Sequence, residues 1–380
     1  MENGCPLSVL LIAEGSGGHL IPALEAATAL ARRGVRARVW YAHRRQTAPL
    51  ARTLIEEARR SSVAVEPLPV ESAAAPWERV RQCGRLWRLA QRGFDAFSPD
   101  VVVGFGGWVS IPVIVAARLR RIGCVLHEQN VILGRANRWL TRWADRVAVS
   151  FPETQRTLNG APGVVTGLPV RSRIGRVRRT EGAARFGLEP ERPTVLVLGG
   201  SQGARVLNRL MTALAAQLTP DERRAWQVIH LTGPSDESAV AEAYAAHGVA
   251  AWVAPSLVEM EAAYAQADLV VARAGASTVA ELARCGKPSV LIPYPHAGGH
   301  QRANARLVEA VGGGVALEES DASPERLLAA VRRLLADARL RSIMGDQIRR
   351  LQCADATARL TEAIIEVGRV KAGVRGAATG

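Results

Sequence analysis

Near the middle of the chain, a short apolar strand leads through a glycine turn into a helix. This segment reads Val195-Leu-Val-Leu-Gly-Gly-Ser-Gln-Gly-Ala-Arg-Val-Leu-Asn208. The first N–H groups of a helix have no partner within it and lie at the positive end of its dipole, so such a turn can hold an anion. Gly199, Gly200 and Gly203 would let a phosphate approach the backbone closely. A tight strand–helix turn without a ligand is the alternative for residues 201–204.

A similar device opens the chain, where the strand 8–13 runs into Glu14-Gly-Ser-Gly-Gly-His19 and a helical pattern. Apolar runs alternate with helical patterns in both halves, which is typical of parallel sheets covered on both faces. With 380 residues, two domains are expected. The sequence therefore predicts an α/β protein with two Rossmann-like domains, whose strand ends face a shared cleft. The predicted strands are 9–13, 37–41, 63–70, 101–104, 124–126, 146–149, 194–198, 227–231, 250–253, 269–272, 289–292 and 314–317.

Glycine, proline and arginine replace the apolar periodicity at residues 166–180, which predicts a hinge there. We expect a first domain over 1–165 and a second domain over 166–345. The helical pattern 340–370 follows the last strand and has no partner strand. Residues 346–380 are therefore expected to return to the first domain as a helix with a flexible tail.

The formal net charge is +14, and Lys287 and Lys371 are the only lysines. The arginine excess follows either from genome composition or from attraction to an anionic partner. The five cysteines are scattered without C-x-x-C spacing, which indicates a reducing compartment and argues against zinc. The uncharged stretch 101–117 contains glycines and a proline and is short for a membrane span, so we expect a cytoplasmic, non-integral protein.

Common nucleotide motifs are absent from the sequence. Leu20 stands where the third glycine of G-x-G-x-x-G belongs, the turn at 199–204 fails the same pattern, and no G-x-x-x-x-G-K-[ST] occurs. No D-x-D occurs to hold a metal ion either. These absences argue against nicotinamide binding and a P-loop.

Several polar residues follow other predicted strands. In Arg273-Ala-Gly-Ala-Ser-Thr-Val-Ala-Glu281, the carboxylate of Glu281 could accept from ribose hydroxyls or could only complement the helix dipole. Gln301 and Asn304 have the reach for sugar hydroxyls, although both are also ordinary residues at a helix start. His19 lies in a first helical turn, where the dipole disfavours imidazolium, so it is a catalytic base, a cap or a substrate contact.

Six motifs in order resemble the MurG-type glycosyltransferases of peptidoglycan synthesis, which have the GT-B fold. Besides the glycine turns at 14–23 and 199–205 and the segment 273–281, they are Gly104-Phe-Gly-Gly-Trp-Val-Ser110, His127-Glu-Gln-Asn130 and Gly167-Leu-Pro-Val-Arg171. The resemblance covers roughly residues 7–366.

The resemblance implies transfer of N-acetylglucosamine from its UDP conjugate to the 4-hydroxyl of N-acetylmuramoyl-pentapeptide on undecaprenyl diphosphate, lipid I, giving lipid II. It implies a peripheral enzyme at the cytoplasmic face of the cell membrane, without cofactor or metal. It further implies that the domain over 1–165 faces the acceptor and the membrane and that the domain over 166–345 binds the UDP-sugar. It also suggests cell-wall synthesis proteins as partners, which the sequence does not identify. His19 matches the family histidine suspected of serving the acceptor. The donor contacts that carry over by motif are Ser16, Gly17, Gly18, Asn130, Arg171, Ser201, Leu257, Ala276, Ser277, Thr278, Val279, Ala280, Glu281 and Gln301.

Two residues depart from the family pattern. Glu14 stands where glycine is usual, so its carboxylate must either point away from the diphosphate or face the nucleophile. Leu168 replaces the common asparagine before Pro169.

The segment 76–94 mixes aromatic side chains with arginines, which is typical of a helix at a membrane interface. Trp77, Trp87 and Phe94 are the predicted membrane contacts. The alternative is a core-facing helix with a solvated basic face.

Two other classes of function are weighed against this assignment. Another GT-B transferase would glycosylate diacylglycerol or a polyketide. A non-catalytic protein would bind a nucleotide sugar or nucleic acid, but the arginines are spread over both halves and do not interleave with stacking aromatics, so no nucleic acid is expected.

Overall fold

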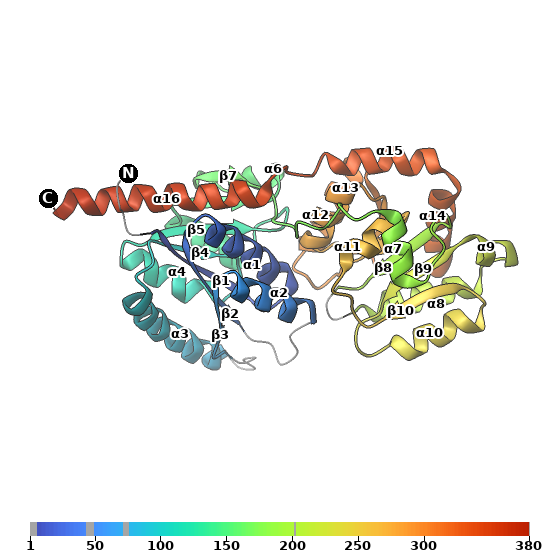
Figure 1. The fold of residues 1–380 in the computed structure, drawn as a ribbon, viewed down its shortest axis with the longest axis horizontal. Helices are drawn as coiled ribbons and strands as arrows, with labels where there is room; N and C mark the ends of the chain where they lie inside the picture. The colour runs from blue at the N-terminus through green and yellow to red at the C-terminus, as the bar shows by residue number, and fades with distance from the viewer. Residues whose placement is uncertain (1–5, 43–48, 71–75, 201–202, 380) are drawn as a thin grey trace. The chain divides into compact units, whose positions relative to one another are not determined.

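The computed structural model describes residues 6–42, 49–70, 76–200 and 203–379. The chain forms two compact units, which are considered separately (Figure 1). Unit 1 contains the chain up to Val170, without residues 48–50, and the C-terminal part of the chain from Cys353 onward. Unit 2 contains Arg171–Gln352 together with residues 48–50.

Unit 1 is built on a parallel sheet of seven strands in the order β3-β2-β1-β4-β5-β6-β7. The interiors of its central strands β1 and β4 are apolar, because both faces of the sheet are covered. The strands are β1 (Ser8–Glu14), β2 (Arg36–Ala42), β3 (Ala64–Leu68), β4 (Val101–Gly104), β5 (Gly123–Glu128), β6 (Arg146–Val149) and β7 (Gly163–Val165).

The helices of unit 1 cover both faces of this sheet. Right-handed crossovers place α1 and α2 on one face and α3 and α4 on the other, and α3 packs against α4. These helices are α1 (Gly17–Arg32), α2 (Pro49–Arg60), α3 (Pro76–Phe97), α4 (Ser110–Leu119), α5 (Arg135–Leu140), α6 (Pro152–Gln155) and α16 (Ala356–Thr379), with a 3₁₀ turn η1 (Thr141–Trp143).

The C-terminal helix α16 packs against α1 and strands β4–β6 of unit 1. Lys371 Nζ lies 2.8 Å from Asp145 Oδ1, while Asp145 Oδ2 accepts the N–H of Cys124 at 2.8 Å. The predicted return of the last helix to the first domain is therefore confirmed. The prediction of one continuous helical stretch over 340–370 is wrong, because its first part belongs to a separate helix, α15, within unit 2.

Unit 2 repeats the plan with six parallel strands in the order β10-β9-β8-β11-β12-β13. They are β8 (Thr194–Leu198), β9 (Gln227–Leu231), β10 (Ala250–Ala254), β11 (Leu269–Ala272), β12 (Ser289–Leu291) and β13 (Gly314–Ala316). The helices are α7 (Arg179–Phe186), α8 (Arg205–Ala216), α9 (Pro220–Ala225), α10 (Glu237–Ala246), α11 (Met260–Gln266), α12 (Ala276–Cys285), α13 (His300–Ala310), α14 (Pro324–Ala336) and α15 (Ala338–Arg349).

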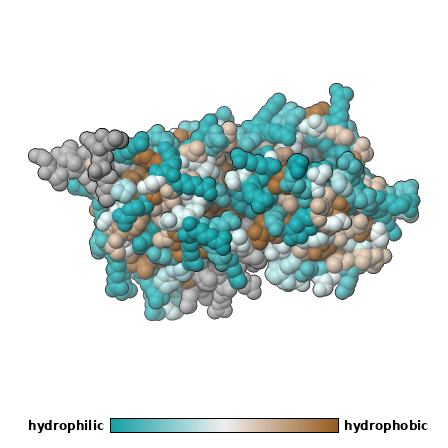
Figure 2. Space-filling view, in the orientation of Figure 1, coloured by the Kyte–Doolittle hydropathy of each residue, from teal (hydrophilic) through white to brown (hydrophobic). Residues whose placement is uncertain are grey.

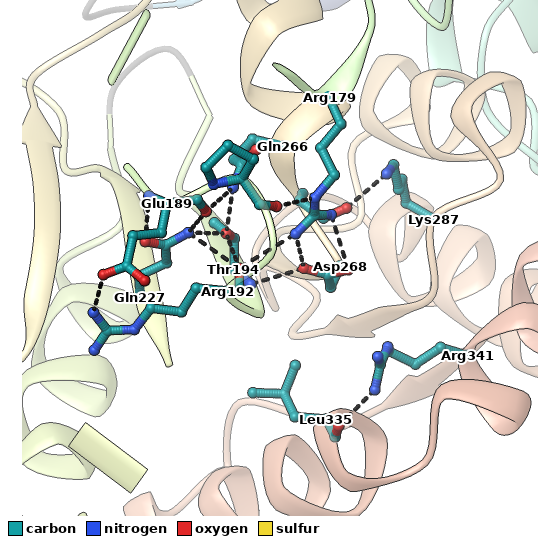
Figure 3. A network of polar contacts seen from close by, with 12 residues as sticks. Arg179, Glu189, Arg192, Thr194, Gln227, Gln266, Asp268, Lys287, Leu335 and Arg341 are labelled. Atoms are coloured by element: carbon teal, nitrogen blue, oxygen red, sulfur yellow. Dashed lines mark hydrogen bonds and ion pairs between the residues drawn. The ribbon is translucent and has the colours of Figure 1, made fainter. Parts of the chain in front are cut away.

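A polar network closes the amino edge of the unit 2 sheet (Figure 3). The Arg179 guanidinium donates two hydrogen bonds to Asp268, at 3.0 and 2.8 Å, and Asp268 Oδ2 also accepts the N–H of Thr194 at 2.8 Å. Lys287 Nζ donates to the carbonyl of Ala267 at 2.6 Å. Gln266 donates to Thr194 Oγ1 at 3.1 Å. At this edge, charged side chains thus form hydrogen bonds with the backbone N–H and C=O groups. The carboxyl ends of the strands are the edge that remains available to ligands.

The predicted fold class is confirmed, and every predicted strand is present within a residue or two of its expected ends. Strand β7 was missed, because Gly163-Val-Val165 lies between the turn residues Pro162 and Thr166-Gly167 and belongs to no longer apolar run. Among the described residues, no helix is both long and apolar enough to cross a bilayer.

Candidate active site

The glycine turn of unit 2 leads into a helix start without a side-chain cap. Ser201 lies outside the described residues, but α8 begins at Arg205 and no side chain caps it. Gly203 has φ +73°, and a Cβ there would lie 2.2 Å from the carbonyl oxygen of Thr232. Only glycine fits this position, and the exposed N–H groups of α8 are suited to an anion.

Helix α12 has the same kind of start. Its N-cap is Gly275 in an extended conformation, again without a side-chain cap. Ala276 and Val279 are buried, whereas Thr278 and Ala280 are half-buried. The hydroxyl of Ser277 is buried and has no hydrogen-bond partner within the described residues. A buried hydroxyl without a partner is uncommon and is consistent with a ligand there.

Arg171 brings a buried positive charge to unit 2. Its Nη1 donates to the carbonyl of Val258 at 2.8 Å and lies 3.4 Å from Glu261 Oε2. Its Nε and Nη2 are buried and have no hydrogen-bond partner among the described residues. Because a guanidinium binds anions through such N–H groups, this half of Arg171 is suited to a phosphate or a carboxylate.

Glu281, near the middle of α12, is half-buried. Its Oε2 accepts a hydrogen bond from the Tyr264 hydroxyl at 2.8 Å. Burial raises the pKa of Glu281, while Arg171 and the Tyr264 hydrogen bond lower it. Its carboxylate is therefore held by specific partners, which a mere complement to the helix dipole would not need.

Three further predicted residues differ in their surroundings. Gln301 Oε1 accepts the N–H of Tyr294 at 2.9 Å, which leaves its amide N–H groups to donate to a ligand. Leu257 is buried just before α11. Asn304 is fully buried and donates to the carbonyl of Ala274 at 3.0 Å, so it braces the turn before α12.

In unit 1, Ser16, Gly17, Gly18 and His19 lie together where β1 passes into α1. The Ser16 hydroxyl does not cap the helix; instead its Oγ lies 2.7 Å from Nδ1 of His19. The imidazole borders Gly106, where a Cβ would lie 3.4 Å from both Cδ2 and Nε2 of the ring. Nδ1 is thus occupied, and the edge carrying Nε2 faces the turn after β4.

Glu14 points toward that same turn. Its Oε1 accepts the N–H of Trp108 at 3.3 Å, and a Cβ on Gly107 would lie 2.2 Å from Glu14 Cγ. The unusual carboxylate therefore packs against Gly107 and is hydrogen-bonded to the backbone N–H of Trp108.

The polar cluster at 127–130 is hydrogen-bonded, with His127, Glu128 and Gln129 buried and Asn130 half-buried. Gln129 Nε2 donates to Nδ1 of His127 at 3.0 Å, so His127 Nε2 carries the proton and donates to the carbonyl of Gly167 at 3.1 Å. Burial lowers the pKa of His127 to about 4, so this histidine is neutral at pH 7. Glu128 accepts from Asn130 through Oε1, and from the Gly134 N–H and Asn137 through Oε2. Asn130 is thereby fixed at the carboxyl end of β5.

The three predicted membrane residues on α3 differ in their exposure to solvent. Trp77 is 59% exposed, Trp87 packs in part against the core, and Phe94 is only 3% exposed. The prediction that Phe94 contacts a membrane is wrong, because this side chain belongs to the core between α3 and the sheet. Val80, 71% exposed, was missed and lies one turn beyond Trp77.

Basic side chains line a hollow of about 940 Å³ beside α3. They are Arg81, Arg85, Arg88 and Arg92. The spacing of four, three and four residues places them on one side of the helix, which the sequence pattern could have revealed. Elsewhere on the molecule, hydrophobic residues are scattered among hydrophilic ones over the face drawn in Figure 2.

Tyr264 was also missed, because a tyrosine in an apolar helix has no pattern that marks it for function. Within the described residues, no three or more His, Cys, Asp or Glu side chains gather in an arrangement that could hold a metal ion.

Two doubly wound parallel sheets, with uncapped helix starts at the carboxyl ends of their strands, match the GT-B fold. The N-terminal domain model of glycosyltransferase family 28 matches residues 9–149, and its C-terminal domain model matches 194–360. The chain belongs to this family and is a MurG-type transferase.

Relatives support this assignment over nearly the whole chain. A Nocardioides protein named UDP-N-acetylglucosamine–N-acetylmuramyl-(pentapeptide) pyrophosphoryl-undecaprenol N-acetylglucosamine transferase is 38% identical, with 95% of this chain and 98% of the relative covered. A protein of the same name from Frankia casuarinae is 40% identical over 84% of this chain and 85% of its own. The crystal structure of Acinetobacter baumannii MurG has a TM-score of 0.73 and 27% identity, covering 95% of this chain and all of that one.

Proposed function

We propose that this transferase moves N-acetylglucosamine from UDP-N-acetylglucosamine to the 4-hydroxyl of the N-acetylmuramoyl-pentapeptide of lipid I, giving lipid II. The names of the curated relatives describe this reaction. The observation that carries the donor assignment is a set of buried polar groups in unit 2 that have no hydrogen-bond partner among the described residues, namely Arg171 Nε and Nη2 and the Ser277 hydroxyl. They accompany two uncapped helix starts, which are suited to a diphosphate.

In this reaction the acceptor oxygen attacks the anomeric carbon and the bond from that carbon to the UDP oxygen breaks, with inversion from α to β. The departing diphosphate gains negative charge, which Arg171 and the N-termini of α8 and α12 would stabilise. Glu281 would accept from the ribose, and Gln301 would donate to a sugar oxygen.

The acceptor hydroxyl must also lose its proton, and we assign this role to His19. With Nδ1–H donating to Ser16 Oγ, Nε2 would keep its lone pair and could take the proton. A positioned base contributes roughly 10²–10⁴-fold in rate. His19→Ala is therefore expected to lower kcat by a factor in this range while the donor KM changes little. A loss of about tenfold or less would reduce His19 to a positioning role.

The direct test is turnover of UDP-N-acetylglucosamine with a soluble lipid I analogue, with diacylglycerol as the competing acceptor. Transfer to diacylglycerol alone would refute the assignment. Donor use is expected to persist in excess chelator, because the proposal assigns the diphosphate to Arg171 and helix N-termini. Activity that is lost in chelator and returns only with magnesium or manganese would contradict it.

The same proposal places the enzyme at an anionic membrane surface through the first turns of α3. Trp77 and Val80 are exposed there, and Arg81 lies 5.9 Å from the Trp77 ring. Apolar side chains that enter the interface and arginines that meet headgroups, at roughly 1 kcal/mol each, would act together.

Replacing Trp77 and Val80 with serine should weaken binding to phosphatidylglycerol vesicles and leave turnover of a soluble acceptor unchanged. Ile343→Ser removes a similarly exposed apolar side chain from unit 2 and is the matched control. High salt should weaken binding of the unmodified protein. Equal vesicle binding by all three proteins would contradict the membrane assignment.

A further inference from the structure

Helix α11 contributes two buried polar side chains, Glu261 and Tyr264, that are three residues apart. This spacing places both on one side of the helix. Glu261 is paired with Arg171, and the Tyr264 hydroxyl is hydrogen-bonded to Glu281. A single short helix therefore contacts both charged residues that the proposed function assigns to the donor.

The helix itself is held firmly. Gly182 of α7 packs so closely on α11 that a Cβ there would lie 2.6 Å from the carbonyl of Ala262. At its last residue, Gln266 donates to the carbonyl of Glu189 at 3.0 Å and to Thr194 (Figure 3). Tyr264 thus lies on a rigid support, which a positioning residue requires.

The direction of the hydrogen bond between Tyr264 and Glu281 is also defined. Tyr264 is fully buried, and burial raises its pKa well above the ordinary value, so its hydroxyl stays protonated and donates. The charged groups that act on Glu281 are Arg171, which lowers its pKa, and Glu261, which raises it. Loss of the Tyr264 hydroxyl would remove a donor and raise the pKa of Glu281 further.

We propose that Tyr264 is a positioning residue for the donor: its hydroxyl holds the Glu281 carboxylate in the orientation that accepts the ribose hydroxyls. This inference rests on the proposed ribose contact of Glu281. Without the Tyr264 hydroxyl, the carboxylate rotates more freely and spends less time in the binding orientation, which affects donor binding and not the chemical step.

The test compares the unmodified enzyme with Tyr264→Phe, Glu281→Ala and the double variant, using UDP-N-acetylglucosamine and its 2′-deoxyuridine analogue. Tyr264→Phe keeps the buried ring and is expected to raise the donor KM about fivefold, the effect of one hydrogen bond, with kcat within about twofold. The increase should shrink with the deoxy donor and disappear in the Glu281→Ala background. It should also grow toward lower pH, because a protonated Glu281 accepts a weaker hydrogen bond than the carboxylate.

Tyr244→Phe is the matched control. It removes another buried tyrosine hydroxyl of unit 2, which is bonded to His230 at 3.0 Å and not to Glu281. It should leave the discrimination between the two donors unchanged, and urea unfolding should show that both phenylalanine variants are folded.

Two different results would overturn the inference, one by excluding the role of Tyr264 alone and the other by excluding the ribose contact of Glu281. If Glu281→Ala removes the discrimination but Tyr264→Phe leaves both discrimination and donor KM unchanged, Tyr264 has only a structural role. If Glu281→Ala itself leaves the discrimination intact, the ribose contact is wrong and the positioning role fails with it.

Discussion

Substitution of Gly107 by alanine tests how Glu14 is packed in unit 1. Gly107 has φ +78°, and a Cβ on it would lie 2.2 Å from Cγ and 2.4 Å from Cδ of Glu14. The Glu14 side chain would have to move, and its hydrogen bond from the Trp108 N–H would break. The effect should therefore depend on the residue at position 14.

The cost has two parts that can be separated. A left-handed conformation costs a non-glycine residue about 1–2 kcal/mol, and displacing Glu14 adds about 1–3 kcal/mol from the lost hydrogen bond and repacking. We expect Gly107→Ala to lower the free energy of unfolding by about 2–5 kcal/mol. Gly34 has the same φ of +78° with no atom within 4 Å of the Cβ position, so Gly34→Ala should show the conformational part alone.

Urea unfolding of Glu14→Ala, Gly107→Ala and the double variant measures the coupling between the two positions. The double variant should be more stable than Gly107→Ala alone, because the overlap has gone and only the left-handed conformation remains unfavourable. If the two substitutions are additive, so that Glu14→Ala destabilises Gly107→Ala further, the packing described for Glu14 is wrong.

Three other outcomes follow from the structure. Gly203→Ala should lower the free energy of unfolding by about 2–5 kcal/mol, because the new Cβ would overlap the Thr232 carbonyl. Gly248 also has a positive φ but has open space at its Cβ position, so Gly248→Ala should cost only about 1–2 kcal/mol. Similar urea midpoints for the two variants would contradict this. Burial lowers the pKa of His230 to about 3, whereas the same side chain in the unfolded protein titrates near 6.5. Below pH 6.5 the unfolded state therefore binds a proton that the folded state does not, and the free energy of unfolding falls as the pH falls. The slope should decrease by about 1.4 kcal/mol per pH unit in His230→Gln, and an unchanged slope between about pH 6 and 4 would refute the assignment. Lys371→Ala should release α16 from Asp145, seen as faster amide exchange in that helix. No change is expected in the Val370→Ala control, because the Val370 side chain on the same helix is 64% exposed.

Most of the fold and much of the candidate site could be predicted from the sequence, because both depend on local patterns. β-branched apolar runs followed by glycines and small residues specify strand, turn and helix start whatever surrounds them. The starts of α1, α8 and α12 were expected for this reason. The identities of Arg171, Glu281 and Gln301 as candidate contacts came from their places in ordered motifs.

Tertiary structure alone decided which face of a helix is buried and which polar atoms find partners. The pattern on α3 permits Phe94 either in the membrane interface or in the core, and only packing against the sheet of unit 1 chose the core. Asn304 and Gln301 are equally plausible sugar contacts in the sequence, yet one bonds to the backbone of Ala274 and the other keeps its N–H groups available.

The sequence by itself therefore determined the two α/β sheets, the positions of the glycine turns proposed to bind anions, and the family, because these follow from residue type and short spacing. The three-dimensional fold decided the environment of Glu14, the neutral state of His127 and the bond from Tyr264 to Glu281. Those properties depend on distances between residues far apart in the chain, which no local pattern encodes. A polar group that the fold buries must find a hydrogen-bond partner within the protein, and its burial shifts its pKa toward the value that favours the neutral form.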